Sequence, residues 1–205
     1  MLKFISIFLI VFLLMCYKSG FTQSENHNRN TIDINAGFSL VGALFDIPVS
    51  PSGVVNKYSF PAIQFTYDYF MNKWISFGAA ASLQFMGLEY DDYTYYDGNT
   101  VVNGNVDIKR YNFGARILFH YLNSGNIDLF SGLRGGFTNW DITENYVCSE
   151  EYSYEEVLDF KTGINFAPQI ILCGLRGYFN SNFGANIELC IGAPCFYSMG
   201  VNYRF

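Results

Sequence analysis

The sequence predicts an eight-stranded antiparallel β-barrel that spans a membrane, and three observations lead to this fold. Apolar and polar residues alternate with a period of two in one segment after another beyond residue 22, which is the pattern of β-strands. The polar face of these segments holds mainly Gly, Ser, Ala, Asn and Gln with isolated charges. Short and long connections alternate along the chain, as in barrels that have tight turns on one rim and loops on the other.

The composition of the 205-residue chain excludes several other classes. Charged residues make up 15% of the chain, whereas average soluble domains carry about 25%. The aromatic content of 19% is too high for a disordered protein. No run after residue 22 approaches the roughly 18 apolar residues that a membrane helix needs, which excludes a polytopic helical membrane protein. The net charge of −6 argues against a nucleic-acid partner.

Residues 1–22 predict a cleavable signal peptide, followed by the barrel domain at 23–205. Lys3 supplies a positive start, residues 4–17 are apolar apart from one serine, and small residues precede the expected cleavage site after Thr22. An uncleaved anchor helix is the alternative. It is disfavoured because the apolar run is short for roughly 30 Å of hydrocarbon.

Eight strands are predicted in order, each with apolar residues at alternate positions. They cover 31–40, 60–70, 75–85, 108–121, 127–137, 164–179, 183–193 and 196–205. Tight turns are predicted at 71–73, 123–125 and 181–182, and long loops at 42–59, 87–107 and 138–162, with a short connection around Pro194. In the sixth strand, unbroken alternation would place Arg176 on the apolar face, so we expect a β-bulge near Cys173 and Gly174.

The composition of the polar face predicts that this face points into a narrow barrel. A soluble, lipocalin-like barrel is the alternative, and it would carry Lys, Glu and Thr along its water-facing side. With three-residue turns, a large polar residue faces a glycine in four predicted pairs: Arg116–Gly132, Arg134–Gly114, Glu188–Gly200 and Thr66–Gly78. Aromatic residues gather near the turn ends of the strands, which is typical of the girdle at a membrane interface. We therefore expect lipid on the apolar side.

Nine titratable side chains are predicted to point inward: Asp33, Asp68, Arg110, Arg116, Asp128, Arg134, Glu188, Arg204 and His120. His120 and Asp128 are expected to face each other, and Arg116, Arg134 and Glu188 to lie near mid-depth. Charges in a narrow lumen must pair or stay hydrated. The favoured interpretation is a structural ion-pair network that fills the barrel, and the alternative is a gate or selectivity element.

Four cysteines follow the predicted cleavage site, and two disulfides are possible among them. Cys148 and Cys195 are expected on the same outer rim, and Cys173 and Cys190 opposite each other in the interior. No pair has CxxC spacing and no histidine lies near one, so a zinc site is not expected, and no cofactor is predicted.

The segments 87–107 and 138–162 are rich in acidic residues and tyrosine. They are predicted to be either solvated loops or a surface that binds an extracellular partner or a divalent cation. The spacing around Asp97 does not match an EF-hand, because Tyr93 and Tyr95 stand where oxygen ligands are needed. Catalysis is not expected, since lipid A-modifying barrels use a histidine near the outer leaflet, whereas His27 precedes the first strand and His120 lies at the turn end.

The last 40 residues resemble the end of small outer-membrane β-barrel proteins of the OmpA/OmpX-like "porin family". The matching elements are Ala167-Pro168, the segment 174–179 with its Gly-x-Arg pattern, Glu188 and the terminal Phe205, and Gly177 is a small departure. The resemblance implies the outer membrane of a Gram-negative bacterium. It also implies that Val201, Tyr203 and Phe205 serve as the assembly signal for the barrel insertion machinery.

Together these observations predict a non-enzymatic outer-membrane barrel with a structural or surface-interaction role. The alternative from another class is a narrow, porin-like channel for small solutes or ions, and a lipid A-modifying enzyme is less favoured.

Overall fold

The computed structural model describes residues 30–39, 54–94, 101–148 and 163–205, and the predicted signal peptide at 1–22 lies outside them. Nine β-strands form in the described residues. They are β1 (Asn30–Phe38), β2 (Val54–Ser59), β3 (Ala62–Phe70), β4 (Ile75–Thr94), β5 (Val101–Ser124), β6 (Ile127–Cys148), β7 (Ile164–Tyr178), β8 (Phe183–Gly192) and β9 (Tyr197–Arg204). No helix in the described residues is long and apolar enough to cross a bilayer.

The strands close into an antiparallel barrel with eight strand positions. β1 pairs with β9 on one side and β3 on the other, and the pairing of β4 with β5 completes the circle. β2 and β3 share one position, since both pair with β4 and only Phe60 and Pro61 separate them. Pro61 has no backbone N–H to donate to the ladder, which accounts for the break. The predicted fold is confirmed.

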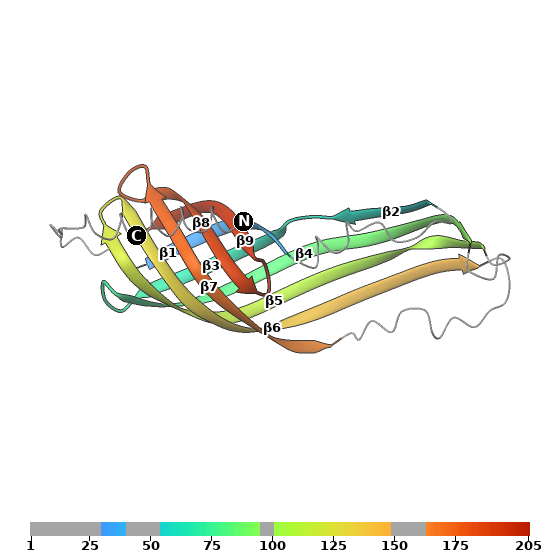
Figure 1. Ribbon diagram of the computed structural model, residues 1–205, viewed down its shortest axis with the longest axis horizontal. Helices are drawn as coiled ribbons and strands as arrows, with labels where there is room; N and C mark the ends of the chain where they lie inside the picture. The colour runs from blue at the N-terminus through green and yellow to red at the C-terminus, as the bar shows by residue number, and fades with distance from the viewer. Residues whose placement is uncertain (1–29, 40–53, 95–100, 149–162) are drawn as a thin grey trace, which may run out of the picture.

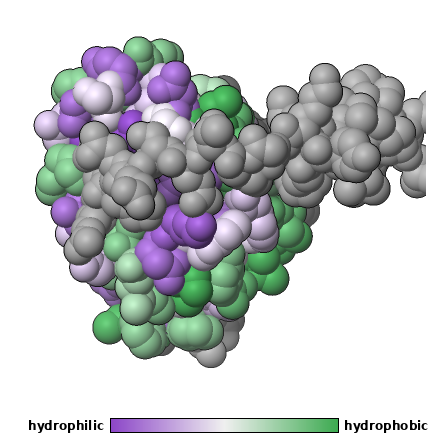
Figure 2. Space-filling model, turned by 90° about the vertical axis from the view of Figure 1, so that its left-hand side faces the viewer, coloured by the Kyte–Doolittle hydropathy of each residue, from purple (hydrophilic) through white to green (hydrophobic). Residues whose placement is uncertain are grey.

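Side chains alternate between an apolar exterior and a polar interior. Large apolar side chains are exposed all around the barrel, such as Ile34, Phe113 and Leu133, whereas Arg116 and Glu188 are at most 3% exposed. In Figure 2, which looks at the turn end of the barrel, hydrophobic side chains reach the outline of the molecule and hydrophilic residues lie among the turns. The predicted orientation of the two faces is confirmed, and the exterior suits contact with hydrocarbon.

Three strands are longer than predicted and project beyond the barrel. Figure 1 shows β2, β4, β5 and β6 running on together past the ends of the other strands, on the side opposite the tight turns. We call this four-stranded extension the projecting sheet. The prediction of loops at 87–107 and 138–162 is therefore wrong for much of both segments, because strand pairing of β4, β5 and β6 continues to Thr94, from Val101 and to Cys148. Residues 95–100 and 149–162 lie outside the described part of the chain.

Candidate functional site: a closed polar interior and a projecting sheet

Two arginines and four carboxylates form an ion-pair cluster at mid-depth in the barrel. Arg116 and Arg176 both contact Asp33 Oδ2, at 3.0 and 2.7 Å, and both form ion pairs with Asp68. Arg116 also pairs with Glu188 at 2.9 Å. Arg176 reaches Asp128 at 3.2 Å. Each of these side chains is almost completely buried, so the charges are shielded from solvent and depend on one another.

A β-bulge places Arg176 in this cluster. The pairing of β7 with β8 shifts between Ile171 and Cys173, and the pairing of β6 with β7 shifts at the same level. One extra residue in β7 reverses which face the following residues occupy, so Arg176 points inward and is fully buried. The predicted bulge is confirmed, next to the expected position. Arg176 was not among the nine predicted inward residues because strict alternation assigned it to the apolar face.

Below the cluster, Ser76, His120 and Asp128 form a hydrogen-bonded chain. His120 Nε2 lies 2.9 Å from Ser76 Oγ, and Nδ1 lies 2.7 Å from Asp128 Oδ1. The predicted contact between His120 and Asp128 is therefore present. This order of groups resembles a hydrolytic triad. However, all three side chains are buried, and the rings of Phe70 and Phe130 pack against the imidazole, so no substrate has access to Ser76 Oγ.

Between the cluster and the projecting sheet, hydrogen bonds from arginine and glutamine side chains to neutral acceptors close the interior. Arg134 donates to Gln64 Oε1 at 2.8 Å and to Asn112 Oδ1 at 2.6 Å. The connection between β8 and β9 folds into the mouth, where Arg110 donates to the carbonyl of Pro194 at 2.6 Å. Gln169 likewise donates to the carbonyl of Cys195 at 2.7 Å. These contacts fill the barrel below the projecting sheet.

Three of the predicted network arginines therefore differ from expectation. Arg134 and Arg110 bind neutral groups, while Arg116 takes the ion pair with Glu188. Arg204 lies at the turn rim, donates to the carbonyls of Gly125 and Ser181, and stacks on Tyr178. It joins the β5–β6 and β7–β8 turns rather than entering the ion-pair cluster.

The predicted cross-strand pairs are wrong, each by two residues. Arg116 faces Arg134, Gly114 faces Gly136, Glu188 faces Ser198 and Thr66 faces Ala80. The β3–β4 connection is longer than a three-residue turn, since Phe70 pairs with Ser76. Glycine still makes room for large residues, but with other partners: a side chain at Gly78 would collide with the Asp68 carboxylate.

Neither predicted disulfide is present, because Cys173, Cys190 and Cys195 carry free thiols. The bulge in β7 moves Cys173 out of line with Cys190, which pairs instead with Ile171. Cys195 lies in the mouth beside Gly37, whereas Cys148 ends β6. From Trp140 to Cys148 the strand extends about 27 Å at roughly 3.4 Å per residue, so the two cysteines lie at different heights.

In the projecting sheet the inward face is apolar and the outward face is polar, which is the reverse of the arrangement in the barrel. Met86, Val106 and Ile108 continue the inward face of β4 and β5, yet they are apolar and form a buried cluster with Leu88, Tyr90, Trp140 and Ile142. Its outer face carries Glu89, Asp107 and Asp141. Such a sheet suits water outside and an apolar core inside. In β4 the apolar positions switch from the outward face to the inward face after Phe85, and this switch marks where the lipid-facing exterior ends.

Two hydrogen bonds anchor the base of the projecting sheet. Tyr58 on β2 donates to Asp107 on β5, and Gln84 donates to the carbonyl of Phe60 at 3.0 Å. The hydrogen bond to the Asp107 carboxylate raises the pKa of Tyr58 to about 12, so the phenol remains a donor at physiological pH.

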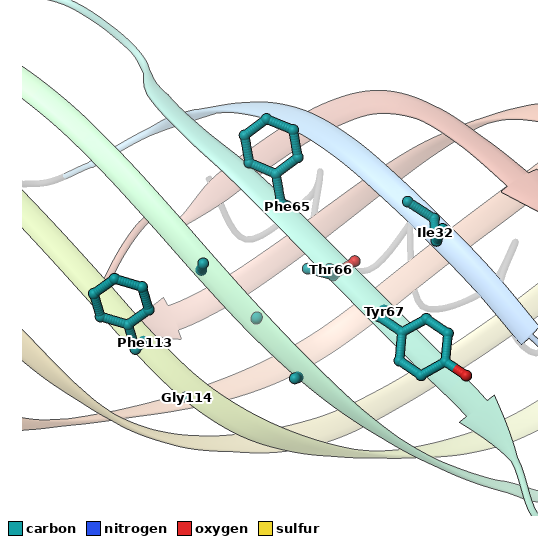
Figure 3. Close-up of a pocket in the computed structure, with 9 residues that line it drawn as sticks. Ile32, Phe65, Thr66, Tyr67, Phe113 and Gly114 are labelled. Atoms are coloured by element: carbon teal, nitrogen blue, oxygen red, sulfur yellow. The ribbon is translucent and has the colours of Figure 1, made fainter.

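The apolar exterior contains an open groove of about 450 Å³. Its floor is formed by Ala79, Ala80 and Ala81 on β4, and Figure 3 shows the rings of Phe65 and Tyr67 on one side and of Phe113 on the other. The lining is almost entirely apolar, which fits a surface that contacts hydrocarbon chains. Among the described residues, no group of three or more His, Cys, Asp or Glu side chains could hold a metal ion.

No protein-family model and no curated protein matches the chain. Among solved structures it is similar to the crystal structure of Ail, the attachment invasion locus protein of Yersinia pestis, in complex with the heparin analogue sucrose octasulfate. The sequence identity is 13%, the match covers 86% of this chain and 99% of the Ail chain, and the TM-score is 0.45. For Ail in a phospholipid bilayer nanodisc the sequence identity is 18%, the match covers 87% of this chain and 100% of that chain, and the TM-score is 0.39. For the N-terminal β-barrel domain of Pseudomonas aeruginosa OprF the sequence identity is 17%, the match covers 86% of this chain and 98% of that chain, and the TM-score is 0.38. With its apolar exterior and closed polar interior, the chain has the fold of a small transmembrane β-barrel.

Proposed function

We propose that the barrel is a non-enzymatic anchor in the outer membrane of a Gram-negative bacterium and that the projecting sheet is an extracellular interaction surface. The observation that carries this proposal is the contrast between the two parts. The interior of the barrel is filled by the ion-pair cluster and by the β8–β9 connection, whereas β4, β5 and β6 continue well beyond it. Strands that project from a closed barrel present a surface to a partner.

The free edge of β6 is the part of this surface best suited to a partner. Within the described residues, β6 pairs with β7 only as far as Asn139, so 140–148 pairs with β5 on one side alone. An unpaired edge offers backbone N–H and C=O groups to an added strand. Asp141 and Glu144 next to this edge favour a partner segment with basic residues.

A strand-forming probe peptide tests this surface. We expect a nonapeptide of alternating lysine and isoleucine to cause saturable NMR shifts in the backbone amides of 140–148, with the protein in lipid nanodiscs. A peptide interrupted by proline cannot pair as a strand and is the control. Asp141→Lys is expected to weaken binding of the first peptide. Equal shifts at the β8–β9 connection, or none at β6, would contradict the proposal.

A narrow channel is the alternative function, and the polar lining along the full barrel favours it. We expect no steady single-channel openings from the refolded protein in planar bilayers, because side chains close the interior. Steady openings that vanish in Glu188→Ala or Arg134→Ala would instead support transport.

We further propose that Val201, Tyr203 and Phe205 form the assembly signal for the insertion machinery. All three side chains are exposed: Val201 and Tyr203 point outward from β9, and Phe205 directly follows this strand. Phe205→Ala is expected to reduce the amount of folded, heat-modifiable protein in outer-membrane fractions severalfold. Asn202→Ala, an inward change on the same strand, serves as the comparison, and an equal loss in both variants would argue against a signal.

A further inference from the structure

Two buried thiols lie in the β8–β9 hairpin at the mouth of the barrel. Cys190 is near the end of β8 and is 3% exposed, and Cys195 lies in the connection to β9 and is 1% exposed. Four residues separate them in the sequence, and both are free thiols in the structure. Their pairing was not among the two disulfides that the sequence predicted.

The hairpin brings the backbones of the two cysteines close together. The amide of Cys190 donates to the carbonyl of Phe196 at 2.7 Å, next to the pair formed by Leu189 and Tyr197, so Cys190 lies opposite Phe196. Cys195 directly precedes Phe196. Hydrogen-bonded residues of an antiparallel pair are about 5.5 Å apart and successive residues advance about 3.4 Å, which places the two Cα atoms about 6.5 Å apart. Disulfides usually join Cα atoms about 4.4–6.8 Å apart, so this pair is within range.

Both side chains point into the same part of the interior. Cys195 Sγ lies 3.9 Å from Gln64 Oε1, which accepts a hydrogen bond from Arg134 at 2.8 Å. The thiols of Cys190 and Cys195 lie within electrostatic range of each other, and both lie within range of Arg134 and Glu188. The two sulfurs therefore share neighbours on the inner side of the barrel wall.

Cys173 is the competing partner for Cys190, and its orientation excludes it. Cys173 pairs with Leu189, the neighbour of Cys190, so its backbone is also close. Directly paired residues share a face of the sheet, and Leu189 is 42% exposed on the outer face. Cys173 therefore points outward while Cys190 points inward, and the barrel wall separates their sulfurs.

We propose that Cys190 and Cys195 form a disulfide that fixes the β8–β9 connection in the mouth of the barrel. The oxidant is a second disulfide, such as that of oxidised glutathione or of a dithiol oxidoreductase. One cysteine thiolate attacks it and displaces one of its sulfurs as a thiolate, and the other cysteine, after losing its proton, displaces the second. The two cysteines lose two electrons and two protons, and the oxidant is reduced to two thiols. Exported proteins retain such bonds.

The disulfide acts on a connection that already closes the barrel. The carbonyls of Pro194 and Cys195 accept hydrogen bonds from Arg110 and Gln169. In the reduced protein these non-covalent contacts hold the connection in the mouth, whereas in the oxidised protein Cys195 is also tied to β8. The redox state of the pair thus sets how firmly the mouth is closed.

Peptide mapping of the full-length protein tests this bond. The protein is refolded into lipid vesicles with reduced and oxidised glutathione present throughout, because both thiols are buried afterwards, and is then unfolded in N-ethylmaleimide. Trypsin releases residues 177–204, which contain both cysteines and no internal Lys or Arg. We expect this peptide to carry no label and to lack two hydrogen atoms. Two labels, a bound glutathione, or a cross-link to the peptide of Cys148 or Cys173 would overturn the proposal.

Two variants and an unfolded sample serve as controls. Cys173→Ser is expected to leave the bond unchanged, and loss of the bond in this variant would contradict the proposal. Cys195→Ser is expected to leave Cys190 as a labelled thiol. In the same glutathione buffer, the oxidised fraction is expected to be severalfold larger in the refolded protein than in the chain kept in urea, because the hairpin holds the thiols together. Equal fractions would refute the claim that the fold positions them.

Discussion

Replacing Arg176 with methionine is expected to lower the free energy of unfolding by about 3–5 kcal/mol. Arg176 is fully buried and pairs with Asp33, Asp68 and Asp128. Methionine fills a similar volume but leaves these carboxylates with less positive charge in a region shielded from water. Urea unfolding of the protein refolded in lipid vesicles, followed by the heat-modifiable gel shift, measures the change.

Lys73→Met is the control for this experiment because it removes a positive charge at the β3–β4 turn, where Lys73 lies over the ring of Trp74. A surface substitution of this kind changes stability by about 0.5 kcal/mol or less. If Arg176→Met unfolded at the same urea concentration as Lys73→Met, the ion-pair cluster would not be the element that stabilises the interior.

Placing an arginine at Leu133 is expected to destabilise the barrel by about 2–4 kcal/mol. Leu133 points outward from the middle of the barrel segment of β6, between Ile117 and Ile170 on the neighbouring strands. An arginine there must bring its charge into hydrocarbon. The same unfolding measurement in vesicles reports the effect.

Thr143→Arg provides a matched control on the same strand. Thr143 also belongs to the outward face of β6, but it lies in the projecting sheet opposite Asp107. Its replacement is expected to change stability by about 0.5 kcal/mol or less. Equal and small effects at Leu133 and Thr143 would mean that water, not lipid, surrounds the barrel.

The two faces of the strands could be predicted from the sequence, but the register could not. Period-two alternation shows that Arg116 and Glu188 share a face, and a shift of two residues leaves every side chain on the same face. The predicted pairs were therefore wrong without any conflict with the pattern. The missing information lies in the turns: Asn72 Oδ1 accepts from the amides of Trp74 and Ile75, in a connection longer than expected.

The composition of the ion-pair cluster was predicted in part. Alternation alone predicts that five members of the cluster point inward: Asp33, Asp68, Arg116, Asp128 and Glu188. Arg176 required the bulge, whose only signal in the sequence was a charge on an otherwise apolar face. The hydrogen-bond partners of Arg134 and Arg110 depend on side chains from distant strands and on the β8–β9 connection, and strand periodicity carries no information about these contacts.

The projecting sheet was mistaken for loops because its alternation changes phase. Odd-numbered residues are apolar in β4 up to Phe85, whereas the even-numbered Met86, Leu88 and Tyr90 are apolar beyond it. The alternation that begins at Ile75 is therefore interrupted after Phe85, although the strand itself continues to Thr94. The phase change is itself the signal that the surroundings turn from lipid to water.

The length of β5 determines how far the projecting sheet extends beyond the lipid-facing part of the barrel. From Lys109, near the level where the lipid-facing exterior ends, to Val101, the strand extends about 27 Å at roughly 3.4 Å per residue. The neighbouring strands stiffen this span by pairing with it along its length. A body that approaches the membrane from the side of the projecting sheet would therefore touch the end of β5 before it reached the lipid, and the length of β5 would set the distance between that body and the lipid surface.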